Sequence, residues 1–351
     1  MPKLTRLSQL TVKHETTMGT DIFAGTYTVA NAVKVYELEF KAIAESTATE
    51  RRPLTGAFGV GEIDVAGAYA GGFTAKTYLV GSGTLATAPA WGIFMPACGW
   101  GQDWTAATNV VYKPATVYSP AAWTSTSDHL GMGSISAYHT VADGAGGATA
   151  IVKKLKGCMG SCTLDLEMGK PGVWSWDFKG AHVTPTDDDT LATGTFGAEG
   201  AISACLNVGA TWTPNGGAAH TPVLRKFQLK TETGPTLRPD MNDASGYISA
   251  LITDRKITYS TEVEIPVDFD ATAGADWWGH LKQTAAAFGV WEIGPVGTAG
   301  AGDRWAINLA KMGVGKVEEG DGDGIQTFSV SGACASAAPA TGGDEVTITF
   351  D

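Results

Sequence analysis

The chain has 351 residues, of which 44% are hydrophobic and 17% charged, and its formal net charge is −12. This balance supplies enough apolar side chains for a sizeable core and excludes a largely disordered chain. The acidic excess disfavours binding to nucleic acid through phosphate neutralisation. No apolar stretch approaches the roughly 20 residues that span a bilayer, and the N-terminus lacks the apolar core of a secretory signal, so we expect no membrane contact.

Frequent glycines and alternating segments favour strands over helices. The chain holds 46 glycines, and apolar and polar residues alternate along 36–42, 226–232 and 257–265. A period of two is typical of antiparallel strands with one covered face and one wet face. Four glutamates fall on the polar faces of these strands: Glu37, Glu39, Glu262 and Glu264.

The predicted elements recur in the same order in the two halves of the chain. The first half has a strand at 33–43, a polar loop at 45–61, a strand at 62–80, a short helix at 89–97 and a strand ladder that ends at 173–181. The second half repeats this order at 222–232, 233–246, 248–265, 276–288 and 325–333. We infer a duplication. The polar, turn-prone segment 185–190 places the domain boundary, which predicts domains 1–186 and 187–351.

Each half has a long polar loop between its first and second strands. The charged residues of interest in these loops are Arg51, Arg52, Arg238 and Asp240. A long loop inside a compact β domain is either functional or a mobile surface excursion, and the sequence leaves both interpretations open.

No motif predicts catalysis, a cofactor or a metal ion. A phosphate-binding loop and a Gly-x-Ser-x-Gly elbow are missing, and no two of the six histidines stand at metal-ligand spacing. The acidic turn at 318–324 lacks the closing glutamate of a calcium loop, because Gly332 occupies that position. Cys158 and Cys162 lack a second ligand pair, so we interpret the five cysteines as reduced and buried, with one disulfide left open.

Several spaced motifs resemble the major tail proteins of siphophages. They are, in chain order, Glu15-Thr-Thr-Met-Gly-Thr-Asp21, Asn31-Ala-Val33, Pro89-Ala-Trp-Gly-Ile-Phe-Met-Pro-Ala-Cys-Gly-Trp100, Val111-Tyr-Lys-Pro114, Lys156-Gly-Cys-Met-Gly160, Met168-Gly-Lys-Pro-Gly172, Trp176-Asp-Phe-Lys-Gly180 and Ile252-Thr-Asp-Arg-Lys-Ile-Thr258. The resemblance implies a mainly β fold of two tandem tail-tube-like β-sandwich or barrel domains. Each domain would carry one short flanking helix and contribute strands to a closed inner barrel.

The resemblance also implies a structural virion protein of the phage tail, assembled in the cytoplasm of the bacterial host and free of catalytic residues. Two such domains per chain imply homotrimeric rings that mimic sixfold symmetry, in preference to hexamers, and that stack into a tail tube. The expected partners are further copies of the chain and the tape-measure, tail-terminator and distal tail proteins. DNA would pass through the bore without binding.

Two sets of charged residues receive a role under this interpretation. The four glutamates would line the bore and keep it negative, although the sequence leaves open whether the polar faces point outward. The three arginines and Asp240 would lie in loops that reach the next ring. The alternative is a two-domain β-sandwich binding module, such as a lectin or an adhesin.

Overall fold

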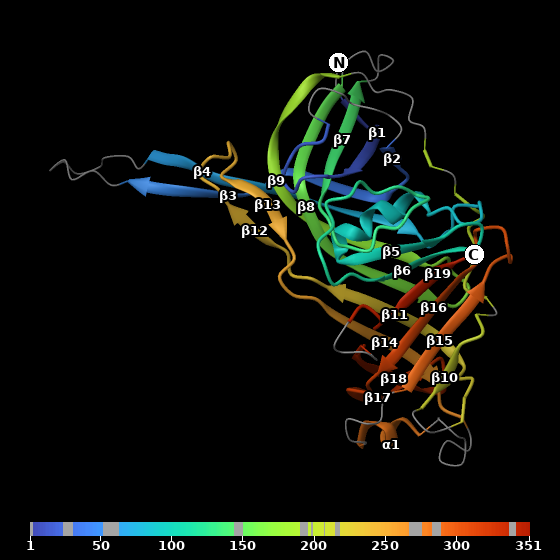
Figure 1. Ribbon diagram of the computed structural model, residues 1–351. Coiled ribbons are helices and arrows are strands. Elements are labelled where there is room, and N and C mark those ends of the chain that lie inside the picture. The colour runs from blue at the N-terminus through green and yellow to red at the C-terminus, as the bar shows by residue number, and fades with distance from the viewer. Residues whose placement is uncertain are drawn as a thin grey trace.

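The computed structural model of the chain describes residues 3–23, 31–51, 63–143, 150–189, 196–197, 199–206, 208–214, 218–266, 276–282, 289–336 and 342–351. The protein is mainly β, as expected (Figure 1). The strands are β1 (Lys3–His14), β2 (Ala32–Val33), β3 (Tyr36–Arg51), β4 (Ile63–Tyr78), β5 (Trp100–Thr105), β6 (Asn109–Pro114), β7 (Ile135–Asp143), β8 (Ala150–Glu167), β9 (Val173–Asp189), β10 (Thr211–Thr213), β11 (Leu224–Glu232), β12 (Thr236–Pro239), β13 (Tyr247–Leu251), β14 (Lys256–Glu264), β15 (Gly289–Val296), β16 (Trp305–Met312), β17 (Lys316–Gly322), β18 (Ile325–Ala333) and β19 (Thr347–Phe350). The helical segments include the 3₁₀ turns η2 (Ala90–Phe94) and η3 (Pro96–Cys98) and the helix α1 (Trp277–Lys282).

One antiparallel path of strands runs through the larger sheet. Its order is β3-β4-β9-β8-β11-β14-β18-β17, so strands from the N-terminal half adjoin strands from the C-terminal half at β8 and β11. Two strands, β7 and β11, pair with successive parts of the same edge of β8. Its first part, Ala150 to Cys158, pairs with β7, and its last part, Cys162 to Glu167, pairs with β11. β7, β1 and β2 therefore branch away from the path near the N-terminus (Figure 1).

The second sheet also draws strands from both halves. Its order is β10-β15-β16-β19-β6-β5, in which β5 and β6 belong to the first half and the other strands to the second. The indole of Trp100 on β5 donates a buried hydrogen bond of 3.2 Å to Thr231 on β11. The two sheets thus share one apolar core, which contains residues of both halves.

Aromatic side chains fill the space between the sheets. Trp174 and Trp176 lie on the same face of β9 and stack with ring centroids 5.2 Å apart. From the 3₁₀ turn η2, Trp91 lies 5.7 Å from Trp174, and Phe94 lies 5.2 Å from Trp176. All four side chains are buried. The two tryptophans of β9 therefore pack in the core against the short helical segment η2, as expected for residues two apart on the apolar face of a strand.

The structure corrects several sequence-based expectations. The described residues form no closed barrel, because the path of strands stays open at β3 and β17. The helix expected at 89–97 consists of 3₁₀ turns, and of the helix expected at 276–288 the structure describes 277–282 as helical, with 283–288 outside the described residues. Strand β9 continues to Asp189, so the segment around the expected boundary at 186/187 belongs to a paired strand, not to a solvated linker.

The cysteines lie in or beside the core as free thiols. Cys98, Cys158, Cys162 and Cys205 are buried, and Cys334 is half-buried. Burial, followed by a hydrogen bond with Cys162, raises the pKa of the Cys98 thiol. Protonated thiols of this kind pack as small apolar groups.

Candidate functional site

The path of strands has one apolar face, packed against the second sheet, and one polar face. On β11, Phe227 and Leu229 are buried, whereas Lys226 and Lys230 on the opposite side are exposed. The same alternation runs through β3, β9 and β14. The polar face therefore presents a broad, solvated surface that crosses both halves of the chain.

All four predicted glutamates lie on this polar face, in two separate places. Glu37 and Glu39 are on β3, at the edge of the path, and Glu262 and Glu264 are on β14. Four strands separate β3 from β14, which at about 4.8 Å per strand puts the two pairs roughly 24 Å apart. The sequence therefore predicted the shared face, and the structure shows that the glutamates form no single cluster.

Basic side chains accompany three of these glutamates. Glu37 pairs with Lys76 on β4. Glu39 pairs with Lys41 at 3.0 Å, and Glu264 pairs with Arg225 at 3.0 Å. Acidic and basic groups thus interleave on the polar face, and its local charge is weaker than four isolated glutamates would produce. The cross-strand partners Lys76 and Arg225 were not identified from the sequence, because pairing between strands leaves no local pattern.

Two strands form the free edges of the path among the described residues. β3 pairs only with β4, and β17 pairs only with β18. β17 carries charged, exposed residues such as Glu318 and Glu319. In β3, Glu37 adopts a φ of 52°, where the register with β4 shifts. Charges and irregular pairing of this kind restrict unwanted strand addition at an edge.

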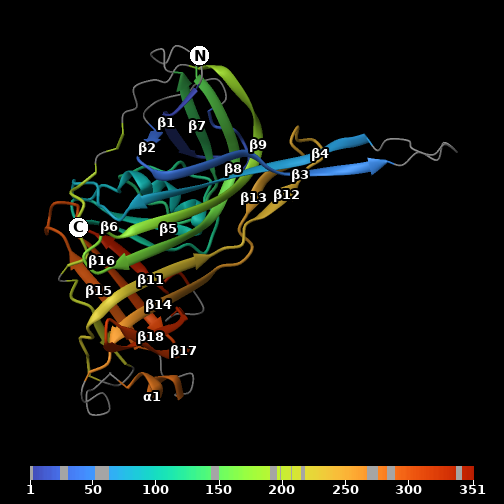
Figure 2. The same ribbon diagram turned by 180° about the vertical axis from the view of Figure 1, so that it is seen from behind.

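The outer part of the hairpin β3–β4 extends beyond the rest of the larger sheet (Figures 1 and 2). β4 pairs with β9 only from Ala70 onward, so before that residue its partner strand is β3 alone. We call the part of this hairpin that lies outside the pairing with β9 the arm. Its described residues are 46–51 of β3 and 63–69 of β4. Arg51 is the last residue of β3 and lies in the arm, whereas Arg52 lies outside the described residues. The expected loop 45–61 is therefore strand as far as Arg51.

The expected loop 233–246 also contains a strand. Arg238 is on β12, which pairs with β13 in a second, smaller hairpin. The Arg238 side chain is exposed, and its Nη1 lies 3.6 Å from the sulfur of Met18. Asp240 caps the turn after β12 by accepting a hydrogen bond of 2.9 Å from the amide of Asn242. Arg238 thus lies close to the N-terminal segment of its own chain.

A buried carboxylate, Glu15, accepts hydrogen bonds from three separate segments of the chain, and it was not identified as a site from the sequence. Glu15 is fully buried. Its Oε2 accepts hydrogen bonds from the amide of Gly19 at 2.8 Å and the hydroxyl of Ser134 at 2.6 Å, and its Oε1 accepts from Ser136 and from the amide of Gly157, both at 2.7 Å. Burial raises the pKa of Glu15, while these hydrogen bonds act in the opposite direction. In the sequence, Glu15 stands out only as part of a motif that resembles the tail-protein family.

Other kinds of site find no support in the described part of the chain. No group of three or more His, Cys, Asp or Glu residues there could hold a metal ion. No helix within those residues is both long and apolar enough to cross a membrane. No protein-family model and no curated protein matches the chain. The geometry of the strand edges, the polar face and the arm therefore carries the functional argument.

Proposed function

We propose that this chain is a structural subunit whose copies join edge to edge into rings, and that the rings stack into a phage tail tube. The observation that carries the proposal is the open path of strands, which consists of two units with the same internal order. The two units are β3-β4-β9-β8 and β11-β14-β18-β17, written in the order in which the strands lie side by side. In both units this spatial order is the first, second, fourth and third strand along the chain.

The segments between the second and third strands of each unit support the same duplication. In the first unit, η2 and η3 are followed by the antiparallel pair β5–β6. In the second unit, α1 is followed by the antiparallel pair β15–β16. Apart from β7 in the first unit and the hairpin β12–β13 in the second, the order of strand, strand, helical turn, hairpin and closing hairpin is the same. This similarity supports two tandem tail-tube-like domains, close to the ranges 1–186 and 187–351.

The junction inside the chain suggests how two copies would join. β8, the last strand of the first unit, pairs antiparallel with β11, the first strand of the second unit, from Glu167 opposite Lys226 to Cys162 opposite Thr231. The equivalent free edges are β17, at the end of the second unit, and β3, at the start of the first. β17 of one copy would therefore pair with β3 of the next copy, as β8 pairs with β11.

Joining these edges in a ring would leave no free edge in the path of strands from β3 to β17. A closed sheet removes the edges that otherwise permit uncontrolled association. Head-to-tail contacts of this kind close only at a fixed number of copies. Three copies would give six similar units, in agreement with the sixfold-like symmetry that the family resemblance implies, and we favour a trimer over a hexamer.

The polar face would line the bore of such a ring. It carries solvated side chains of both signs, including the four glutamates and their basic partners. A surface without a strong positive field would let DNA pass without adsorbing. The apolar face is already occupied by the second sheet, so it is unsuited to that role.

The decisive experiment is negative-stain electron microscopy of the purified protein, combined with light-scattering mass. We expect rings or hollow tubes, and the ring mass divided by the subunit mass of 36.3 kDa gives the number of copies. A strictly monomeric protein that binds glycans would overturn the proposal in favour of a binding module.

An edge variant sharpens this test. The turn Asp323-Gly324, with φ values of 55° and 82°, places Gly322 and Ile325 in a hydrogen-bonded pair. By alternation along β17, the amide of Glu319 then points to the free edge. We expect Glu319→Pro to remain folded and to lose ring formation, whereas Glu319→Ala, which keeps the amide, forms rings. Rings of Glu319→Pro would contradict the proposed junction.

A further inference from the structure

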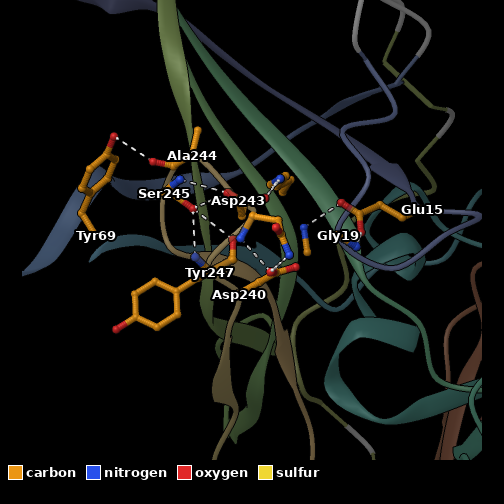
Figure 3. A network of polar contacts seen from close by, with 11 residues as sticks. Glu15, Gly19, Tyr69, Asp240, Asp243, Ala244, Ser245 and Tyr247 are labelled. Atoms are coloured by element: carbon orange, nitrogen blue, oxygen red, sulfur yellow. Dashed lines mark hydrogen bonds and ion pairs between the residues drawn. The ribbon is translucent and has the colours of Figure 1, made fainter. Parts of the chain in front are cut away.

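The loop 240–247 of the hairpin β12–β13 lies between the body of the protein and the base of the arm. Figure 3 shows its residues Asp240, Asp243, Ser245 and Tyr247 beside Tyr69 of β4. The loop belongs to the second half of the chain, whereas Tyr69 belongs to the first. It thus connects parts of the chain that are far apart in sequence.

An ion pair fastens the loop to the body. Lys156 on β8 donates to the Oδ2 of Asp243, and the two side chains are only 17% and 13% exposed. The Oδ1 of Asp243 accepts hydrogen bonds from the amide of Ser245 at 3.0 Å and from its hydroxyl at 2.9 Å. Burial acts to raise the pKa of Asp243, but the hydrogen bonds from Lys156 and Ser245 hold it below its ordinary value. Asp243 therefore shapes the loop and anchors it at the same time.

Two glycines allow β13 to approach the body closely. A Cβ on Gly19 would lie 2.3 Å from the carbonyl oxygen of Ile248, and a Cβ on Gly157 would lie 2.5 Å from the Cβ of Ser249. Both glycines have positive φ values, 77° and 58°. The amides of these two glycines donate hydrogen bonds to the Glu15 carboxylate. Glu15 thereby holds the platform on which β13 rests.

The opposite side of the loop contacts β4. The amide of Tyr69 donates a hydrogen bond of 2.9 Å to the carbonyl oxygen of Ser245. The Tyr69 hydroxyl donates one of 3.4 Å to the carbonyl oxygen of Ala244. Gly246 packs so closely that a Cβ there would lie 2.6 Å from the Cβ of Ala68. The loop therefore takes the place of β9 as neighbour of β4 immediately before Ala70, where pairing with β9 begins.

We propose that the loop 240–247 is a brace that sets the direction in which the arm leaves the body, with Asp243 as its positioning residue. A two-stranded ribbon is by itself marginally stable and strongly twisted, so its direction depends on what holds its base. The brace acts at that base and is fixed on its other side through Lys156. If the proposed function holds, the brace also governs the spacing and straightness of stacked rings.

The proposal is tested by hydrogen–deuterium exchange of the full-length chain in its unassembled state. Gly246 has a φ of 79° and faces Ala68, so Gly246→Ala should push the loop away from the arm. Gly169 has a φ of 75° with no atom within 4 Å of an added Cβ, so Gly169→Ala reproduces the backbone strain without the contact. We expect Gly246→Ala to raise exchange at the Tyr69 amide about tenfold relative to Gly169→Ala. Equal exchange in the two variants would overturn the proposal.

Asp243→Asn provides a second variant that keeps the shape of the side chain. We expect it to raise exchange at Tyr69 while the amides of 73–78, which lie in the part of β4 paired with β9, keep wild-type exchange. The matched control is Asp240→Asn, because within the described residues the Asp240 side chain accepts hydrogen bonds only from Asn242 in the same loop. An increase spread equally over 63–78 would show general destabilisation and contradict a brace.

Electron microscopy separates this inference from the proposed function. If the wild-type chain forms tubes, those of Gly246→Ala should be measurably more curved than those of Gly169→Ala, and equally straight tubes would contradict the role in stacking. If the wild-type chain forms no tubes, the proposed function fails, and the exchange at Tyr69 still decides whether the brace exists.

Discussion

The arm and the hairpin β12–β13 arise at the same place in the two units, between the first and second strands, yet one extends and the other folds back. β3 runs from Tyr36 to Arg51 without a glycine or a proline, so nothing in its sequence interrupts the strand. β11 ends at Glu232 and is followed by Gly234, with a φ of 48°, and by Pro235. A glycine in the left-handed region and a proline break the strand and turn the chain toward its own body.

Tertiary anchors complete the difference between the two excursions. The Thr233 hydroxyl donates a buried hydrogen bond of 2.6 Å to the carbonyl oxygen of Gly160, at the point where the chain leaves β11. Lys156 then holds the far end of the hairpin through Asp243. In the arm, by contrast, the described strand pairing of 63–66 is with β3, and pairing of β4 with β9 begins only at Ala70. Equal topology therefore yields one docked hairpin and one projecting arm, which is suited to contact another molecule.

Removal of the outer arm gives the largest expected effect. We expect deletion of 48–59 to abolish tube formation while the free energy of unfolding changes by less than about 0.5 kcal/mol. The reason is that the described residues of the deletion, 48–51, pair only with 63–66 of β4, and these residues of β4 do not pair with β9. Electron microscopy and denaturant unfolding measure the two quantities. Full-length tubes formed by the deletion variant would assign stacking to another part of the chain.

Acidic pH should lower the free energy of unfolding through His14, which precedes Glu15 in the chain. Burial, followed by the proximity of His129, lowers the pKa of His14 to about 3, whereas an unfolded imidazole titrates near pH 6.5. Between these values the unfolded state binds the extra proton, so this contribution to stability is present above about pH 6.5 and is lost as the pH falls. The expected loss is about 1.4 kcal/mol per pH unit.

The variant His14→Gln isolates this contribution, because the raised pKa of Glu15 acts in the opposite sense. Denaturant unfolding between pH 6 and pH 4 should show a slope against pH that is smaller in the variant by about 1.4 kcal/mol per pH unit. An unchanged slope would mean that His14 is protonated in the folded protein. Measurements at pH 8 provide the reference, since both proteins then hold a neutral residue 14.

The ion pairs on the polar face should show the smallest effects and a difference between the two units. Glu37 and Lys76 are 68% and 44% exposed, whereas Glu264 and Arg225 are 27% and 21% exposed. We expect Glu37→Gln to cost less than about 0.5 kcal/mol and Glu264→Gln about 1 kcal/mol. Denaturant unfolding measures both. The reverse order would show that the β3 edge is held more rigidly than its exposure indicates.

The sequence predicted the strands well where apolar and polar residues alternate. The segments 226–232 and 257–265 fall in β11 and β14, and 325–333 coincides with β18. Alternation accounts for the polar face at Glu39, Glu262 and Glu264, whereas Glu37 lies at a register shift, and its neighbour Tyr36 is exposed. The role of the four glutamates in a bore remains a prediction. The expected loops failed as predictions of irregular structure, since a polar composition at 45–51 and 236–239 does not prevent strand pairing. The roles of Arg51, Arg52, Arg238 and Asp240 in stacking remain predictions.

By itself, the sequence determined the mainly β class and most of the alternation of faces, because both depend on residues close together in the chain. Only the tertiary structure decided that β8 joins β11, that the path of strands stays open, and that the hairpin β12–β13 docks. Glu15 illustrates the reason, since its carboxylate accepts a hydrogen bond from the amide of Gly157, 142 residues away in the chain. Contacts of this kind depend on which surfaces meet when the sheets pack, and no local periodicity records them.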